Sequence, residues 1–441
     1  MSTTSTIIMA GGLGTRMRSP RPKVLHDLCG APMLAWVEAA AREAGADDVV
    51  VVVSPAIADE IGAAFPQVEV AIQSPANGTG HAVEVGLAAL GGRAEHVLIL
   101  SGDTPAIRAE TVRAVREAGS SAGVDGALAI AQVAPPHAYG RVIRSGGAVE
   151  RIVEARDASA EELAIADINV GIYCVRASAL EQALSRVGAA NAQGERYLTD
   201  AIGLLSGTVV AVDEDDVASC EGINSMRELA GLDELLRHRL LDAAMLAGVR
   251  IVDPSSTFID RDVTLAPGSR IEPFCQLRAG TTVAEGAVVG PYVAAHGARI
   301  GPRCVVGPFA YLRPGTVLHE RASVGRFVEL KGAEIGNDSK VPHLSYLGDV
   351  TVGERVNIGA GTITANYDGF AKHRTEIADG ARTSSNSVLV APVRIGEGAT
   401  VAAGSVITED VPDGALGIAR PRQVVKEGYA ERVAARREEE S

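Results

Sequence analysis

An apolar or small residue recurs at every sixth position through most of the second half of the chain, from Leu265 to Ile407. This period differs from the roughly 3.6 residues of a helix. Hexapeptide repeats form short flat strands, and three strands close one coil of about 18 residues. At roughly 4.8 Å between coils, the repeats predict about eight or nine coils and a prism about 40 Å long. The number of consecutive matches favours a parallel β-helix over an ordinary β-sandwich with accidental periodicity.

Two further features of the repeats carry structural predictions. Glycine often follows the apolar position, as in Ile300-Gly301 and Val324-Gly325. We expect these glycines to supply positive φ angles in tight turns. The period is interrupted between Thr364 and Glu376, where Asn366-Tyr367-Asp368-Gly369 predicts a loop extruded from the prism.

The first half of the chain, residues 1–225, alternates short apolar runs with amphipathic segments, which is typical of βαβ units. The pattern predicts an α/β doubly wound, Rossmann-like sheet that binds ligands at the carboxyl ends of its strands. Residues 226–248 predict a linker helix, and residues 249–441 contain the β-helix and a C-terminal tail. The expected strands are 6–10, 48–53, 68–72 and 96–100, and the expected helices lie near 33–44 and 79–90.

Bulk composition excludes several classes of protein. The formal net charge is −14, which argues against a nucleic-acid-binding protein with a broad basic surface. The five cysteines are widely spaced and form no C-x-x-C pair, so we expect structural thiols in a reducing compartment. Since no segment approaches about 18 consecutive apolar residues, we expect a cytoplasmic protein without membrane insertion.

A glycine-rich turn with two cations follows the first expected strand. It reads Ala10-Gly11-Gly12-Leu13-Gly14-Thr15-Arg16-Met17, with Lys23 after Pro22. Glycine lets backbone amides approach phosphates closely, and Arg16 and Lys23 can neutralise a triphosphate and the pyrophosphate that leaves it. The string is neither a Walker loop nor a dinucleotide fingerprint, and its length favours a nucleotide site over a purely structural turn.

With this string, the chain resembles the sugar nucleotidyltransferases. The resemblance extends over nearly the whole chain to the family of bifunctional N-acetylglucosamine-1-phosphate uridyltransferase/glucosamine-1-phosphate N-acetyltransferases. It implies that Asp103 and Asn224 bind Mg²⁺, a hard ion that prefers oxygen ligands. In isolation, Asp103 could equally cap the following helix. The residues implied to bind UTP or the sugar nucleotide are Ala10, Gly11, Gly12, Lys23, Gln73, Gly78, Thr79, Gly140, Glu154, Asn169 and Asn224.

Polar side chains also interrupt the repeats of the second half. Arg313 and Lys331 fall one coil apart on the same wall, which predicts an anionic ligand. A phosphorylated substrate held there could present its nucleophile to His343, although an isolated histidine is more often structural. The resemblance implies that His343 is a general base. It also implies contacts to glucosamine-1-phosphate or acetyl-CoA by Arg313, Lys331, Tyr346, Asn357, Ala360, Asn366, Tyr367, Ser385, Ala403 and Arg420.

Together, these patterns predict an enzyme with two sites. The resemblance implies a left-handed parallel β-helix that acetylates glucosamine-1-phosphate with acetyl-CoA. It implies a first domain that converts N-acetylglucosamine-1-phosphate and UTP into UDP-N-acetylglucosamine and pyrophosphate, with Arg16 and Lys23 stabilising charge. It also implies a homotrimer. One alternative is a nucleotidyltransferase alone, with a structural or regulatory β-helix, and another is a non-enzymatic ligand-binding scaffold.

Overall fold

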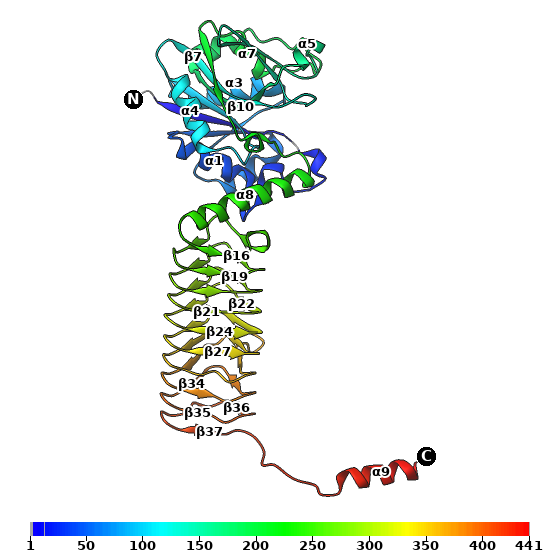
Figure 1. Cartoon of the computed structure of the whole chain (residues 1–441), viewed down its shortest axis with the longest axis vertical. Helices are drawn as coiled ribbons and strands as arrows, with labels where there is room; N and C mark the ends of the chain where they lie inside the picture. The colour runs from blue at the N-terminus through cyan, green and yellow to red at the C-terminus, as the bar shows by residue number, and fades with distance from the viewer. Residues whose placement is uncertain (1–2, 13, 441) are drawn as a thin grey trace. The chain divides into compact units, whose positions relative to one another are not determined.

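The computed structural model describes residues 3–12 and 14–440, and the chain divides into two compact units, Met1–Arg239 and Leu240–Ser441. Figure 1 colours the chain from blue at the N-terminus to red at the C-terminus. Among the helices of the described residues, none has the length and apolar character needed to cross a bilayer.

The first unit is built on one mixed β-sheet with the strand order β11-β7-β10-β6-β1-β4-β5, and β8 and β9 form a hairpin that joins it at β10. Neighbours β1, β4, β5 and β6 run parallel, whereas β10 is antiparallel to β6 and β7. The predicted doubly wound α/β fold is therefore confirmed, with one antiparallel strand inserted. The strands are β1 (Thr4–Met9), β4 (Val49–Val53), β5 (Glu69–Ile72), β6 (His96–Ser101), β7 (Val124–Gln132), β8 (Arg141–Ser145), β9 (Ala148–Val153), β10 (Asp167–Arg176) and β11 (Thr208–Asp213).

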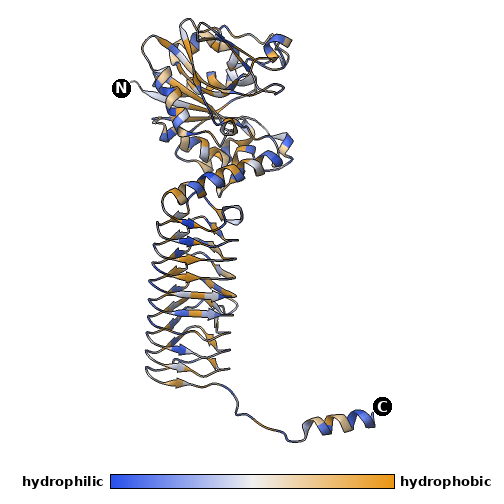
Figure 2. Cartoon of the chain, viewed as in Figure 1, coloured by the Kyte–Doolittle hydropathy of each residue, from blue (hydrophilic) through white to orange (hydrophobic). Residues whose placement is uncertain are grey.

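Helices cover both faces of this sheet. One core joins Val37 of α1 and Val112 of α4 to the sheet, and the other joins Val83 of α3 and Leu180 of α6 to its opposite face. Burial on both sides explains why β4 consists of five consecutive valines, all of them buried. The orange strands in Figure 2 show this apolar interior. The helices up to residue 246 are α1 (Met33–Glu43), α2 (Ala58–Ala64), α3 (Gly78–Leu90), α4 (Ala109–Gly119), α5 (Ala160–Leu163), α6 (Ala177–Leu184), α7 (Leu198–Ile202) and α8 (Met226–Leu246), of which α8 has residues in both units. Short 3₁₀ turns are η1 (Thr15–Met17), η2 (Lys23–Leu25), η3 (Pro55–Ile57) and η4 (Val217–Cys220). A small hairpin consists of β2 (Asp27–Leu28) and β3 (Ala31–Pro32).

The second unit is a parallel β-helix with three walls, seen in Figure 1 as a stack of flat coils. Wall 1 contains β12 (Arg250–Ile251), β15 (Arg270–Ile271), β18 (Val288–Val289), β21 (Val305–Val306), β24 (Ser323–Arg326), β27 (Lys340–His343), β32 (Arg382–Thr383), β35 (Thr400–Val401) and β37 (Leu416–Gly417). Wall 2 contains β13 (Phe258–Ile259), β16 (Gln276–Arg278), β19 (Ala294–His296), β22 (Ala310–Leu312), β25 (Val328–Lys331), β28 (Tyr346–Gly348), β30 (Ile363–Ala365), β33 (Val388–Val390) and β36 (Val406–Ile407). Wall 3 contains β14 (Thr264–Leu265), β17 (Thr282–Val283), β20 (Arg299–Ile300), β23 (Val317–Leu318), β26 (Glu334–Ile335), β29 (Val350–Val352), β31 (Thr375–Ile377) and β34 (Val393–Ile395). The 3₁₀ turn η5 (Pro254–Ser256) lies in the first coil, and α9 (Tyr429–Glu439) lies in the tail.

The strand count and the register confirm the hexapeptide prediction. Wall 2 has nine strands, in line with the predicted eight or nine coils. Equivalent repeat positions stack on one another, as Leu312 does on Leu330. The predicted apolar positions are buried, except for the half-buried Leu265 in the first coils. These stacked side chains form the core of the unit.

The two ends of this core differ. At the first coil, Leu241 of α8 is fully buried in the β-helix core, and Leu240, Ala244 and Met245 pack against it. At the last coil, Gly417 pairs with the core residue Val401, and the flanking Leu416 and Ile418 are each 59% exposed. Among the described residues, the helical side chains in this buried cluster all come from α8, at the first end.

The role predicted for the repeat glycines is mostly wrong. Of the glycines that follow the apolar positions, Gly307 has a positive φ, but Gly301, Gly325 and Gly336 do not. A Cβ atom on any of these three would lie closer than 3.0 Å to a backbone oxygen of the next coil. Glycine is required there because neighbouring coils approach each other closely, whereas many positive φ angles in the unit belong to other residues, Phe274 and Arg303 among them.

The predicted extruded loop is present between β30 and β31. Tyr367 and Lys372 form an antiparallel bridge across it. Asp368 Oδ1 accepts hydrogen bonds from the amides of Phe370 and Ala371, at 2.8 and 2.7 Å, and closes the tip. Phe370 at the tip is 97% exposed.

Candidate functional site

The first unit has a topological switch point at the carboxyl end of β1. The chain leaves β1 for β4 and β5 on one side and returns to β6 on the other, which is the topology that opens a ligand crevice in doubly wound sheets. Gly11 follows β1, and a Cβ atom there would lie 3.3 Å from Gln73 Oε1. Gly12 has open space around it, whereas Ala10 is buried. Leu13 of the same loop lies outside the described residues.

The segment that contains Gln73, Gly78 and Thr79, which are predicted to bind UTP or the sugar nucleotide, is held by its neighbours. Gln73 Nε2 donates to the carbonyl oxygen of Gly78 at 3.0 Å. Thr79 Oγ1 accepts a hydrogen bond from the amide of Leu198 at 3.0 Å. Gly78 has a φ of 87° and contacts the backbone of Arg196, so a side chain does not fit there. The geometry therefore brings Gln73, Gly78 and Thr79 together at the start of α3.

Lys23, Asp103, Asn224 and Arg16 converge although they are far apart in sequence. Lys23 Nζ lies 2.6 Å from Asp103 Oδ2 and 3.0 Å from Asn224 Oδ1. Arg16 Nη2 donates to the same Asn224 oxygen at 2.7 Å. Asn224 is placed here because the amide of Ile223 donates to the carbonyl oxygen of Asp103 at 2.9 Å. Two cations therefore face a carboxylate and an amide oxygen at the end of β6.

The oxygen atoms of Asp103 and Asn224 fit the requirements of Mg²⁺. Both are hard donors, and both already point at one positive centre, the Lys23 ammonium. Within residues 3–12 and 14–440, no three His, Cys, Asp or Glu side chains cluster as a metal site. Two protein oxygens match the usual Mg²⁺ arrangement, in which phosphate and water oxygens complete the coordination.

Gly140, Glu154 and Asn169 also come together. The amide of Asn169 donates to the carbonyl oxygen of Gly140 at 2.9 Å. A Cβ atom on Gly140 would lie 3.5 Å from Glu154 Oε2. Glu154 lines a cavity of about 540 Å³, and burial raises the pKa of its carboxyl. Asn169 exchanges hydrogen bonds with the Tyr173 hydroxyl at 2.6 and 2.9 Å, and its Oδ1 accepts a further bond from the amide of Gly171 at 3.2 Å, which fixes the amide orientation.

On the β-helix, Arg313 and Lys331 are adjacent, as predicted, because they follow the paired residues Leu312 and Leu330. Arg313 donates to Glu329 Oε1 at 2.8 Å. Lys331 Nζ contacts both oxygens of Asp349, at 2.9 and 2.8 Å.

Two further charged residues, Asp349 and Lys372, belong to this group and were not predicted from the sequence. Asp349 Oδ2 also accepts a hydrogen bond from Asn366 Nδ2 at 2.6 Å, so it joins Lys331 to the extruded loop. Lys372 of the loop lies beside Lys331, which lowers the pKa of Lys372. The signal for Asp349 was its place directly after Tyr346-Leu347-Gly348. Tyr367 turns away from this group, since its hydroxyl donates to the carbonyl oxygen of Gly369 at 2.6 Å.

His343 lies at the corner between walls 1 and 2 and is exposed. Three predicted residues continue this corner through successive coils. The amide of Gly361 donates to the carbonyl oxygen of His343 at 3.4 Å, that of Asn386 to Ala360 at 2.8 Å, and that of Gly404 to Ser385 at 2.9 Å. His343, Ala360, Ser385 and Ala403 therefore belong to one column. Arg420 extends it, since a Cβ atom on Gly404 would lie 3.9 Å from Arg420 Cδ.

His343 and the cations lie toward opposite edges of wall 2. His343 and Leu344 precede β28, whereas Asp349 follows it. The three-residue width of β28 corresponds to about 10 Å. Tyr346 lies in this interval, with its hydroxyl next to Gly348 and Asn366. Asn357 is exposed on wall 1, where it bridges Lys340 and Arg382 of the neighbouring coils.

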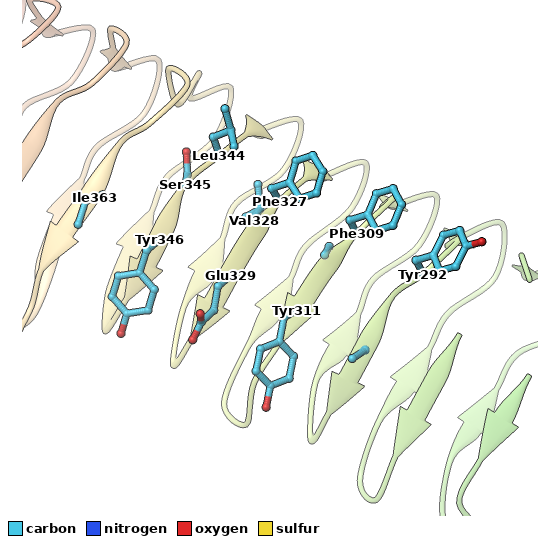
Figure 3. Close-up of a pocket in the computed structure, with 12 residues that line it drawn as sticks. Tyr292, Phe309, Tyr311, Phe327, Val328, Glu329, Leu344, Ser345, Tyr346 and Ile363 are labelled. Atoms are coloured by element: carbon cyan, nitrogen blue, oxygen red, sulfur yellow. The ribbon is translucent and has the colours of Figure 1, made fainter. Parts of the chain in front are cut away.

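Wall 2 also carries an aromatic ladder, consisting of Phe274, Tyr292, Phe309 and Phe327. Their rings stack along one edge with centroid distances of 4.7, 4.8 and 5.3 Å. Each ring is about half exposed. Beside the ladder lies a hollow of about 520 Å³, shown in Figure 3 with Tyr311, Glu329 and Tyr346 on its other side. This ladder was not predicted from the sequence, although its members recur at the spacing of one coil.

Comparisons with known proteins cover both units. The family model of the MobA-like NTP transferase domain matches residues 6–199. The chain is 43% identical to the bifunctional protein GlmU of Streptomyces coelicolor, over 97% of this chain and 94% of that protein. It is 43% identical to the bifunctional protein GlmU of Sorangium cellulosum, over 98% of this chain and 97% of that protein. The corresponding protein of Halalkalibacterium halodurans is 41% identical over 97% of this chain and 99% of its own length.

Proposed function

The chain belongs to the family of bifunctional GlmU proteins, and from this premise we propose how its residues divide the work of two transfer reactions. It is an enzyme that makes UDP-N-acetylglucosamine. One activity transfers an acetyl group from acetyl-CoA to glucosamine-1-phosphate, and the other transfers a uridylyl group from UTP to N-acetylglucosamine-1-phosphate. Because the similarity spans both units at 41–43% identity, a purely structural β-helix is not favoured.

We propose that uridylyl transfer takes place at the carboxyl ends of β1 and β6. The observation that carries this assignment is the convergence of Lys23 Nζ on Asp103 Oδ2 and Asn224 Oδ1, at 2.6 and 3.0 Å. A phosphate oxygen of the sugar substrate attacks the α-phosphorus of UTP, and pyrophosphate leaves. Lys23 and Arg16 stabilise the negative charge that builds up on the phosphates. Mg²⁺ held by Asp103 and Asn224 would supply further neutralisation of that charge.

The two ends of the sugar nucleotide are assigned to the groups on either side of these cations. The backbone of Gly11 and Gly12 approaches the phosphates, with Ala10 at the end of β1. Gln73, Gly78 and Thr79 hold the uracil, and Gly140, Glu154 and Asn169 hold the sugar. The hydrogen bonds that fix Gln73 to Gly78 and Asn169 to Gly140, at 3.0 and 2.9 Å, support this division.

We propose that acetyl transfer takes place on wall 2. Arg313 and Lys331 bind the phosphate of glucosamine-1-phosphate, and His343 removes a proton from its amino group as the nitrogen attacks the acetyl carbonyl carbon. The thiolate of CoA then leaves. Strand β28, which lies between His343 and Asp349, is about 10 Å wide, close to the length of a sugar phosphate, which supports this placement.

The remaining residues on the β-helix are assigned to the two substrates by their positions. Tyr346, Asn357, Asn366 and Tyr367 are assigned to the amino sugar. The column of Ala360, Ser385 and Ala403, which continues from His343 toward Arg420, is assigned to acetyl-CoA. The backbone hydrogen bonds that stack this column support the assignment, because they place its members in line with the base.

We propose that the enzyme is a cytoplasmic homotrimer. The aromatic ladder and the hollow beside it form an exposed apolar surface. Exposed apolar patches on folded proteins often mark protein–protein interfaces, which supports this proposal. A second copy fits it well, because its coils repeat at the same spacing. Cys174, Cys220, Cys275 and Cys304 are buried thiols, which agrees with a reducing compartment.

The test is to assay the full chain with each substrate pair. Pyrophosphate release from UTP and N-acetylglucosamine-1-phosphate, and CoA release from acetyl-CoA and glucosamine-1-phosphate, are both expected. EDTA should stop the first and spare the second, because only the first site has oxygens placed for Mg²⁺ among the residues assigned here. Failure of either release with active controls would refute that half of the proposal, and inhibition of both by EDTA would refute the metal assignment.

A further inference from the structure

Two consecutive residues of α7 contact the opposite ends of the uridylyl transfer site. Leu198 donates its amide hydrogen to Thr79 Oγ1 at 3.0 Å, in the segment assigned to uracil. Thr199 donates its hydroxyl hydrogen to Glu154 Oε1 at 3.1 Å, in the group assigned to the sugar. Thr199 is 5% exposed, so its hydroxyl has little access to water. Its role lies in what it does to Glu154.

The start of α7 is held firmly against α3. The amide of Gly80 donates to the carbonyl oxygen of Arg196 at 2.8 Å, and the amide of Arg196 donates to that of Asn77 at 3.2 Å. The Arg196 guanidinium also forms a two-pronged ion pair with Glu84. Because α7 is fixed in this way, the Thr199 hydroxyl is presented to Glu154 from a rigid support.

The surroundings of Glu154 otherwise disfavour its ionised form. Burial raises the pKa of the Glu154 carboxyl. Two nearby carboxylates, Asp200 on α7 and Asp157 in the turn after β9, raise it further. Arg156 and the Thr199 hydroxyl act in the opposite direction. Two phenols, Tyr173 on β10 and Tyr197 before α7, lie near enough for the Glu154 charge to raise their pKa values. Among these described neighbours, Thr199 alone donates a side-chain hydrogen bond to Glu154.

We propose that Thr199 is a positioning residue for uridylyl transfer, which orients the Glu154 carboxylate to accept hydrogen bonds from the sugar and links it rigidly to the uracil segment. This inference rests on the proposed function, since Glu154 is assigned to the sugar there. Glu154 Oε1 is engaged by Thr199, and Oε2 lies on the side of Gly140, toward the group assigned to the substrate. A carboxylate held by one oxygen keeps the other in a defined direction.

The experiment compares Thr199→Val, Thr199→Ala and Thr199→Ser in the full chain. Loss of the hydroxyl should raise the KM for N-acetylglucosamine-1-phosphate about tenfold, the value of one hydrogen bond to a charged group, with a smaller change in the KM for UTP. Thr199→Ser should stay close to the parent enzyme. Since the hydroxyl lowers the Glu154 pKa, the rise in sugar KM at acid pH should begin at a higher pH in the two hydroxyl-free variants.

Glu154→Gln separates this inference from the assignment beneath it. If Glu154→Gln leaves the sugar KM unchanged, the sugar assignment of the proposed function is wrong. If Glu154→Gln raises the sugar KM but both hydroxyl-free variants keep the parent KM and pH profile, the role of Thr199 is wrong. In a Glu154→Gln background, Thr199→Ala should shift no pH profile, and an undiminished shift there would also overturn the proposal. CoA release by each preparation serves as the internal activity control.

Discussion

Lys23 Nζ lies 2.6 Å from Asp103 Oδ2, although the two residues are 80 positions apart in the sequence. The Lys23 side chain is only 9% exposed, so the charge is held in place rather than free in solvent. A buried ammonium beside the end of β6 is placed where phosphate charge would accumulate. When a triphosphate binds, its oxygens would partly replace Asp103 as the partner of the Lys23 ammonium.

Lys23→Met should reduce the kcat for pyrophosphate release by about 10²–10³-fold, because it removes a charge aimed at the reacting phosphates. CoA release should be unchanged. Steady-state kinetics of both reactions on one preparation provide the measurement. Arg21→Met is the matched control, since Arg21 pairs with the exposed Asp27 and should leave both rates near the parent values. Equal losses in the two variants would contradict a specific role for Lys23.

His343→Ala should lower the rate of CoA release by about 10²–10⁴-fold, the usual contribution of a general base. Pyrophosphate release should persist. His319→Ala is the control, because His319 is an exposed histidine on the same β-helix that pairs with Glu334 at 2.8 Å. An unchanged rate of CoA release in His343→Ala would show that another group removes the proton.

Phe327→Asp should disrupt the trimer, because a carboxylate in the aromatic ladder is costly to bury against another apolar surface. Sedimentation velocity should show a shift from three chains to one, together with a fall in CoA release. Leu246→Asp is the control, since that leucine is 90% exposed outside wall 2. A Phe327→Asp variant that still sediments as a trimer would move the interface to another face.

Gly325→Ala should destabilise the β-helix by at least about 2 kcal/mol, because the new methyl group would overlap the carbonyl oxygen of Pro342 in the next coil. Gly398→Asn should cost less, since Gly398 has a φ of 62° that asparagine tolerates and open space around it. Urea unfolding followed by circular dichroism compares them. The opposite order of stabilities would show that the close approach of the coils is not what requires glycine at position 325.

The sequence predicted the fold well because both units have strong periodic patterns. Buried positions such as Leu312 and Leu330 recur with the coil, and β4 is a continuous apolar run, so each pattern has one structural solution. The roles of glycines such as Gly301 were predicted wrongly. The sequence shows that glycine stands at these positions. Only the distance to the next coil shows whether a larger residue is excluded by the backbone conformation or by lack of space.

The candidate sites were predicted in part. Lys23 and Asp103 lie in recognisable strings, and their convergence follows from the order of the strands. Thr199 and Asp349 could not be assigned, because their significance comes from which carboxylate or amine they face across the fold. The aromatic ladder was visible in principle, since its rings recur once per coil. The six-residue pattern identifies the inward-facing core positions, whereas the ladder residues point outward and fall outside that pattern.

Leu241 of α8 packs into the first coil of the β-helix core, whereas no helical residue of the described chain packs into the last coil. Thermal fraying and proteolytic attack should consequently start at the rung nearest the tail and travel toward α8. The same asymmetry gives the unit a direction, since a helix packs onto the core at one end and the edge strands β36 and β37 form the other.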